Sequence, residues 1–124
     1  MKPNPVGWFE IYVQDIARAK AFYQSVFACE LQHLPAGPEV EMWAFPMDMG
    51  AMGAAGALVR MEGFAAGGNS TIVYFTSEDC KTEEQRVTKA GGRIEKPKFS
   101  IGDYGYICLA YDTEGNMFGI HSQN

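Results

Sequence analysis

The chain has no run of Lys or Arg, no long apolar segment and no closely spaced pair of cysteines. Ten Lys and Arg stand against 15 Asp and Glu, for a net charge of -5, so we expect no nucleic-acid partner. No stretch approaches the roughly 18 apolar residues of a membrane-spanning helix, and the N-terminus has no apolar signal-peptide segment. Three widely separated cysteines, without a CxxC pair, indicate small buried side chains in a reducing compartment. These absences predict a cytoplasmic protein with no membrane partner.

What remains is typical of a globular protein. The 124 residues are 47% apolar and 20% charged, and a chain of this length buries enough surface for one domain. We therefore expect a single domain over residues 1–124.

Apolar and polar residues alternate at the start of the chain, which predicts a strand over 6–13. One face is apolar, and the other is mixed and carries Trp8, Glu10 and Tyr12. Asp15 is placed to cap a helix, and the apolar positions from Ile16 to Phe27 have the spacing of an amphipathic helix. Three further strands are expected at residues 29–34, 40–45 and 57–61.

The same order recurs in the second half of the chain. A strand is expected over 71–76, and Asp79 can cap a helix that ends near Ala90, before Gly91-Gly92. Strands follow at residues 93–98, 104–111 and 117–122, with a hairpin turn at 112–116. Two modules of strand, helix and three strands, at about 6–62 and 70–123, are therefore predicted. One helix per module covers one sheet face, so the other face must meet the second module, a partner chain or a ligand.

The stretch FEIYVQDIARAKAFYQSVF at residues 9–27, with the closing hairpin at 112–116, resembles the vicinal oxygen chelate superfamily. Members include glyoxalase I, extradiol dioxygenases and bleomycin- or fosfomycin-resistance proteins. Phe9-Glu10-Ile11, together with residues 115–121, is similar to a glyoxalase-related bacterial branch. The resemblance implies an α+β fold in which two tandem βαβββ modules form curved mixed sheets around a cup-shaped cavity. It also implies a small-molecule ligand, and we expect a homodimer because each module leaves one sheet face to be covered.

Metal-dependent members hold a divalent ion on inward-facing His and Glu residues. The corresponding positions here are Trp8, one residue within 58–60, a position at or beside Ile72, and Gly119. None carries a carboxylate or imidazole ligand. We therefore predict no cofactor and no metal site of the usual kind, which argues against a true lactoylglutathione lyase.

Glu10 and His121 are the candidate catalytic residues. A carboxylate between Phe9 and Ile11 that faces a desolvated cavity can act as a general base, whereas on a solvated face it would only be a surface charge. His121 can pair with Glu10 as an acid and base, or it can be a surface residue near the end of the last strand. A divalent metal held by these two residues is the less favoured alternative, because two ligands bind weakly.

The candidate substrate-binding residues combine aromatic rings with polar tips and include one cation. They are Trp8, Tyr12, Trp43, Arg60, Tyr74 and Tyr106. Such aromatic residues suit a pocket wall and equally a core or a dimer interface. His33 is expected to be exposed and Cys108 buried. The loop at residues 48–57 lacks the spacing of a phosphate-binding loop and can act as a mobile lid.

Three functions remain open at this point. The first is a glyoxalase-related enzyme, of lyase or isomerase type, that transfers a proton on an unknown small metabolite without the usual metal. The second is a non-catalytic drug-binding protein of the resistance type, whose acidic charge would suit a cationic ligand. The third is an interaction protein whose cup is only a dimer surface.

Overall fold

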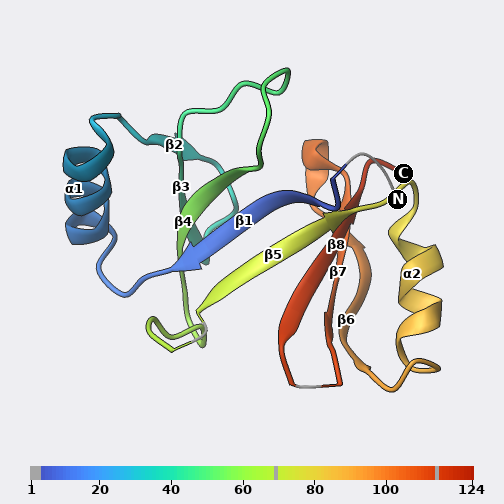
Figure 1. Cartoon of the computed structure of the whole chain (residues 1–124). Coiled ribbons are helices and arrows are strands. Elements are labelled where there is room, and N and C mark those ends of the chain that lie inside the picture. Colours follow the sequence, from blue (N-terminus) through green and yellow to red (C-terminus); the bar gives the residue numbers. More distant parts are fainter. Residues whose placement is uncertain (1–3, 69, 114) are drawn as a thin grey trace. The chain divides into compact units, whose positions relative to one another are not determined.

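The computed structural model describes residues 4–68, 70–113 and 115–124, and it is an α+β structure with eight strands and two α-helices in this part of the chain (Figure 1). The chain divides into two compact units. The N-terminal unit is Trp8–Thr71, and the C-terminal unit is Met1–Gly7 with Ile72–Asn124. The predicted α+β class is confirmed. Glu114, in the predicted hairpin turn, lies outside the described residues.

The N-terminal unit holds one helix and a four-stranded mixed sheet. Its elements are β1 (Val6–Tyr12), which enters this unit at Trp8, then α1 (Ile16–Phe27), β2 (Gln32–Leu34), β3 (Val40–Ala44) and β4 (Ala55–Met61). The strand order is β2-β3-β4-β1, with β1 parallel to β4 and the other neighbours antiparallel. Asp15 caps α1 as expected, since its carboxylate accepts a hydrogen bond from the Arg18 N–H at 3.0 Å.

The C-terminal unit repeats this plan. Its elements are β5 (Thr71–Thr76), α2 (Cys80–Val87), β6 (Arg93–Ser100), the 3₁₀ turn η1 (Gly102–Tyr104), β7 (Tyr106–Tyr111) and β8 (Met117–Ser122). The order is β5-β8-β7-β6, with β5 parallel to β8. Asp79 caps α2 through the Lys81 N–H at 3.0 Å. Because both units share one strand order and one capped helix, the predicted internal repeat is confirmed.

Several predicted boundaries were wrong, and backbone hydrogen bonds explain two of them. Helix α2 ends at Val87 rather than near Ala90, since Gly91 turns left-handed (φ +100°) and the Gly92 N–H reaches the Val87 carbonyl at 2.9 Å. Strand β2 begins at Gln32 rather than residue 29, because the left-handed Ala28 (φ 51°) still closes the end of α1. Strand β4 begins two residues early, at Ala55.

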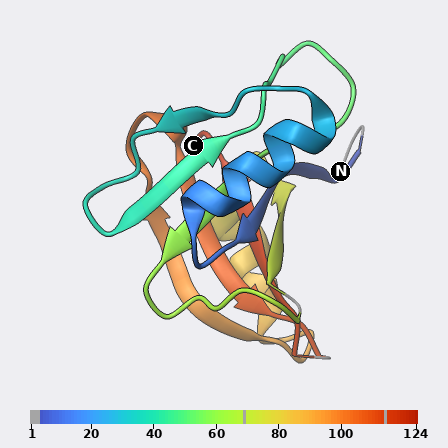
Figure 2. The ribbon, with the colours of Figure 1, turned by 90° about the vertical axis from the view of Figure 1, so that its left-hand side faces the viewer.

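The helix of the N-terminal unit lies across one face of its sheet (Figure 2), but less deeply than its apolar spacing predicts. Tyr23 packs edge-on against Phe45 with ring centroids 5.6 Å apart, and the Lys20 ammonium lies 3.3 Å from the centre of the Trp43 ring. No residue of α1 is buried, and Phe22 and Phe27 are 59% and 65% exposed. The expected apolar stripe of α1 is therefore only partly covered.

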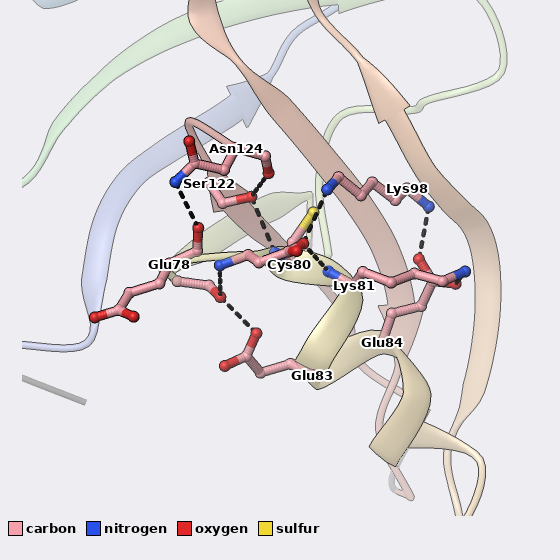
Figure 3. Close-up of polar contacts among 10 residues, drawn as sticks. Glu78, Cys80, Lys81, Glu83, Glu84, Lys98, Ser122 and Asn124 are labelled. Carbon is pink, nitrogen blue, oxygen red and sulfur yellow. Dashed lines mark hydrogen bonds and ion pairs between the residues drawn. The ribbon is translucent and has the colours of Figure 1, made fainter.

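Helix α2, unlike α1, has buried residues that join it to its sheet. Its first residue, Cys80, is buried with Cys108 and Ile120, and its N–H donates to the Ser122 hydroxyl at 2.9 Å (Figure 3). Burial raises the pKa of the Cys108 thiol to about 12, so this thiol stays protonated at neutral pH. The prediction of a buried Cys108 is confirmed, whereas Cys29 is only half-buried.

Glu84 is a buried acidic residue on α2 that joins the helix to β6. Its carboxylate accepts the Lys98 N–H at 2.7 Å and the Lys81 ammonium at 3.1 Å (Figure 3). We expect Glu84→Ala to lower the free energy of unfolding by about 1–3 kcal/mol, because it leaves the Lys98 N–H without its partner. Glu78→Ala is the control in chemical denaturation, since this side chain is exposed and should change stability by less than about 0.5 kcal/mol. Equal losses in both variants would contradict the structural role.

The ion pair between Asp79 and Lys98, with 2.8 Å between Oδ1 and Nζ, makes stability depend on pH. The hydrogen bond to Lys98 lowers the pKa of Asp79 below its ordinary 3.8, and the same bond raises the pKa of Lys98 above 10.5. The stabilisation is therefore complete between these values, is lost as pH falls below 3.8, and is lost as pH rises above 10.5. We expect Lys98→Met to be less stable than the wild type at pH 7 and closer to it at pH 2–3, measured by urea unfolding. A difference that stays constant with pH would contradict this.

Candidate active site

Strand β1 places three candidate residues on one face of the N-terminal sheet. Glu10 is only 7% exposed. Its Oε2 accepts from the Trp8 indole N–H at 3.1 Å, and its Oε1 accepts from the Tyr12 hydroxyl at 2.5 Å. Because residues two apart on a strand point to the same side, the sequence alternation that predicted this grouping is sufficient to produce it. We call Trp8, Glu10 and Tyr12 the Glu10 cluster.

The residues beside Glu10 in strands β4 and β3 are small and apolar. The register pairs Glu10 with Ala57 and Ala57 with Ala44, and both alanines are buried. The Tyr12 ring stacks on Phe64, with centroids 5.1 Å apart. The Glu10 carboxylate is thus oriented by the Trp8 and Tyr12 donors. It lies beside the two alanine side chains, on the sheet face turned away from α1. A carboxylate in such a setting can accept a proton from a bound molecule.

Two residues expected in the same pocket lie elsewhere in this unit. Trp43 pairs with Leu58, one position away from the Ala44–Ala57 pair, so it lies on the sheet face that α1 covers. Arg60 lies on that face as well, and its Nε donates to the Gln14 carbonyl at 3.2 Å. Neither residue shares the face of Glu10. His33 is exposed, as expected, and packs edge-on against Trp43.

The candidate residues of the C-terminal unit also lie on two different faces of its sheet. Tyr74 pairs with Gly119, and its ring fills the space where a Cβ would stand. His121 lies on the same face as Tyr74, and its Nε2 lies 2.6 Å from the Tyr104 carbonyl oxygen, so Nε2 carries the proton. Tyr106 pairs with Ser122 and packs against the Cys80 core on the opposite face. Glu10 and His121 belong to different units, and their pairing stays a prediction.

The residues at the superfamily's metal positions do not fit a metal ion. Trp8 donates its N–H to Glu10, Ile72 is aliphatic, and the Tyr74 ring lies against Gly119. Residues 58–60 offer an aliphatic pair and a guanidinium. Within residues 4–68, 70–113 and 115–124, no three His, Cys, Asp or Glu side chains come together as a ligand group.

A hollow of about 450 Å³ lies beside the Glu10 cluster and was not predicted. It is lined by Gln14, Arg60, Met61, Glu62, Gly63, Phe64 and Ala65. Phe64 contributes to both features, since it also stacks on Tyr12. No periodicity marks residues 62–65, which are a turn and loop, so the sequence alone held no signal for this wall. The loop predicted to act as a lid exposes Met49 and Met52, and its role stays a prediction.

The comparisons with known proteins agree with this architecture. The family described as bleomycin resistance protein-like N-terminal matches residues 6–37, which include the Glu10 cluster. No curated protein matches the sequence. The fold is similar to that of a hypothetical protein from Bacillus halodurans C-125, with a TM-score of 0.74, 11% identity, and coverage of 99% of this chain and 96% of the other.

Two methylmalonyl-CoA epimerases have a similar fold. A variant of the Streptomyces coelicolor enzyme, in complex with 2-nitronate-propionyl-CoA, has a TM-score of 0.68 at 16% identity, with 98% of each chain covered. The Mycobacterium tuberculosis enzyme has a TM-score of 0.68 at 12% identity, with 97% of this chain and 88% of the other covered.

In the described part of this chain, no helix has both the length and the apolar character needed to cross a bilayer.

Proposed function

Since this chain has the fold of the vicinal oxygen chelate superfamily, as its sequence resemblance implied, we propose that it is an enzyme that transfers a proton on a small molecule, with Glu10 as the general base. The observation that carries the proposal is the buried Glu10 carboxylate, oriented by the Trp8 and Tyr12 donors. A buried carboxylate is costly to keep unless hydrogen bonds hold its charge, and the Trp8 and Tyr12 donors supply two such bonds.

The proposed step breaks a C–H bond next to a carbonyl group. The proton goes to a Glu10 oxygen, and the electron pair moves into the carbonyl to form an enolate. Delivery of a proton from water to the opposite side of the same carbon, with the Glu10 proton released to solvent, is epimerisation, and return of the proton from Glu10 to a neighbouring atom is isomerisation. Trp8 and Tyr12 hold the carboxylate in place during this exchange.

The similarity to two epimerases supports the class of chemistry and not the substrate. An epimerase acts at one stereocentre without an oxidant or reductant, and removal of the proton at that centre is within the capacity of a single positioned carboxylate. The predicted role of His121, the homodimer and the cytoplasmic location are not needed for this step and stay predictions.

Hydrogen–deuterium exchange tests the proposal without knowledge of the product. The purified protein is incubated in D₂O with methylmalonyl-CoA, with the hemithioacetal of methylglyoxal and glutathione, and with α-keto acids. Mass spectrometry then follows deuterium at the carbon next to the carbonyl. We expect exchange above the buffer rate with at least one of these compounds. If Glu10→Gln exchanges at the same rate as the wild type, Glu10 is not the base.

A second candidate function is ligand sequestration, and the family match over residues 6–37 favours it. The net charge of -5 suits a cationic ligand such as a glycopeptide antibiotic. Thermal-shift titration with bleomycin separates the two functions. Saturable stabilisation by the drug, without deuterium exchange on any compound of the panel, would favour sequestration over catalysis.

A further inference from the structure

The hollow beside the Glu10 cluster lies where two parallel strands end. Gln14 follows β1, Arg60 and Met61 end β4, and a turn then leads through Glu62 and Gly63 to Phe64. Because β1 and β4 are parallel, both carboxyl ends reach the same edge of the sheet. A volume of about 450 Å³ is within the usual range for small-molecule sites.

The Arg60 guanidinium contributes a positive charge to the lining of this hollow. Its Nε is held by the Gln14 carbonyl at 3.2 Å, whereas its two terminal nitrogens have no hydrogen bond or ion pair among the residues that the structure describes. The acid opposite it in the sheet, Glu41, instead accepts the Trp43 indole N–H at 3.2 Å. A guanidinium fixed at one nitrogen presents the others as a preorganised fork, and this fork matches the two oxygens of a carboxylate.

The other walls define what accompanies the anion. Phe64 and Met61 form an apolar side suited to a hydrocarbon or aromatic group. Glu62 places one negative charge beside the one positive charge of Arg60, so the lining is neutral overall. A dianion such as phosphate would meet repulsion from Glu62 that a monoanion feels less. The lining therefore favours a monocarboxylate with an apolar body.

We infer that this hollow is a carboxylate-binding subsite in which Arg60 holds the anionic end of a small apolar molecule. If the proposed function holds, that molecule is the substrate. The Phe64 ring forms a wall of the hollow and stacks on Tyr12, whose hydroxyl donates to Glu10. A molecule anchored at Arg60 thus shares the hollow with Phe64, whose ring stacks on Tyr12, the residue that donates to Glu10.

Nuclear magnetic resonance titration tests the subsite by itself. The probes are 3-phenylpropionate, its neutral amide 3-phenylpropionamide, and inorganic phosphate, added to the ¹⁵N-labelled full chain. We expect saturable shifts of the amides of residues 60–65 with the carboxylate, and affinity at least about tenfold weaker for the amide and for phosphate. Arg60→Gln should weaken carboxylate binding about tenfold, and Glu62→Gln should improve phosphate binding. Arg18→Gln, an exposed arginine on α1, is the matched control and should change neither.

Each outcome decides the inference. Equal binding of the carboxylate and the amide by the wild type would overturn it without recourse to any variant. Shifts spread over the surface, or unchanged by Arg60→Gln, would overturn it as well. Glu10→Gln separates the two proposals, because it should abolish deuterium exchange and leave carboxylate binding intact. Exchange that requires Glu10 without selective binding at residues 60–65 would keep the function and reject the subsite. Selective carboxylate binding at residues 60–65, with deuterium exchange that does not need Glu10, would keep the subsite and reject the proposed function.

Discussion

Glu10→Gln should lower kcat/KM for proton exchange by about 10²–10⁴-fold, the usual contribution of a general base. The amide has nearly the same shape as the carboxylate and still accepts a hydrogen bond through its oxygen, so the packing around Trp8 and Tyr12 is largely retained. What it loses is the capacity to take up a proton. The rate should therefore fall with little change in KM, and in the thermal transition the variant should remain folded.

Glu41→Gln is the matched control for this experiment. Glu41 also accepts an indole N–H from the tryptophan two residues away on its strand, at 3.2 Å from Trp43, but it lies on the sheet face that α1 covers. It should keep the rate of the wild type within about twofold. Similar losses in both variants would show that any Glu-to-Gln change in this sheet disturbs activity, and the assignment of Glu10 as base would fail.

Gly105→Ala should cause the largest loss of stability, about 2–4 kcal/mol, which combines a strained backbone with an overlap. Gly105 follows η1 with φ +102°, a conformation that L-residues rarely adopt, and a Cβ there would overlap the Ser122 carbonyl oxygen. Because that oxygen belongs to the backbone at the end of β8, it cannot turn aside as a side chain would. Urea unfolding and the thermal midpoint measure the effect, with about 3–5 °C expected for each kcal/mol.

Gly102→Ala separates the two causes. Gly102 also has a positive φ, of +73°, but no atom lies within 4 Å of its ideal Cβ. This variant should lose only the conformational part, about 1 kcal/mol. If the two variants are equally destabilised, the close approach to Ser122 contributes nothing and the backbone conformation alone explains the effect.

The candidate site was predictable where one strand contains it. Trp8, Glu10 and Tyr12 share a face because they are two apart, whatever lies beside them. Trp43 and Arg60 could not be placed in this way, because their side depends on how β3 and β4 pair with β1. A shift of one residue in that register exchanges the two faces. The register puts Ala44 and Ala57 beside Glu10 and turns Trp43 and Arg60 toward the face of α1.

Local interactions within the sequence determined the alternating strands, the capped helices and the repeat of strand order, because period-two patterns and Asp caps act over a few residues. The tertiary structure decided the helix ends, the surroundings of Glu10 and the hollow at Arg60. These depend on contacts between residues distant in sequence, such as Gln14 with Arg60 and Tyr12 with Phe64. Side-chain packing selects such contacts among many alternatives that a linear pattern treats as equivalent.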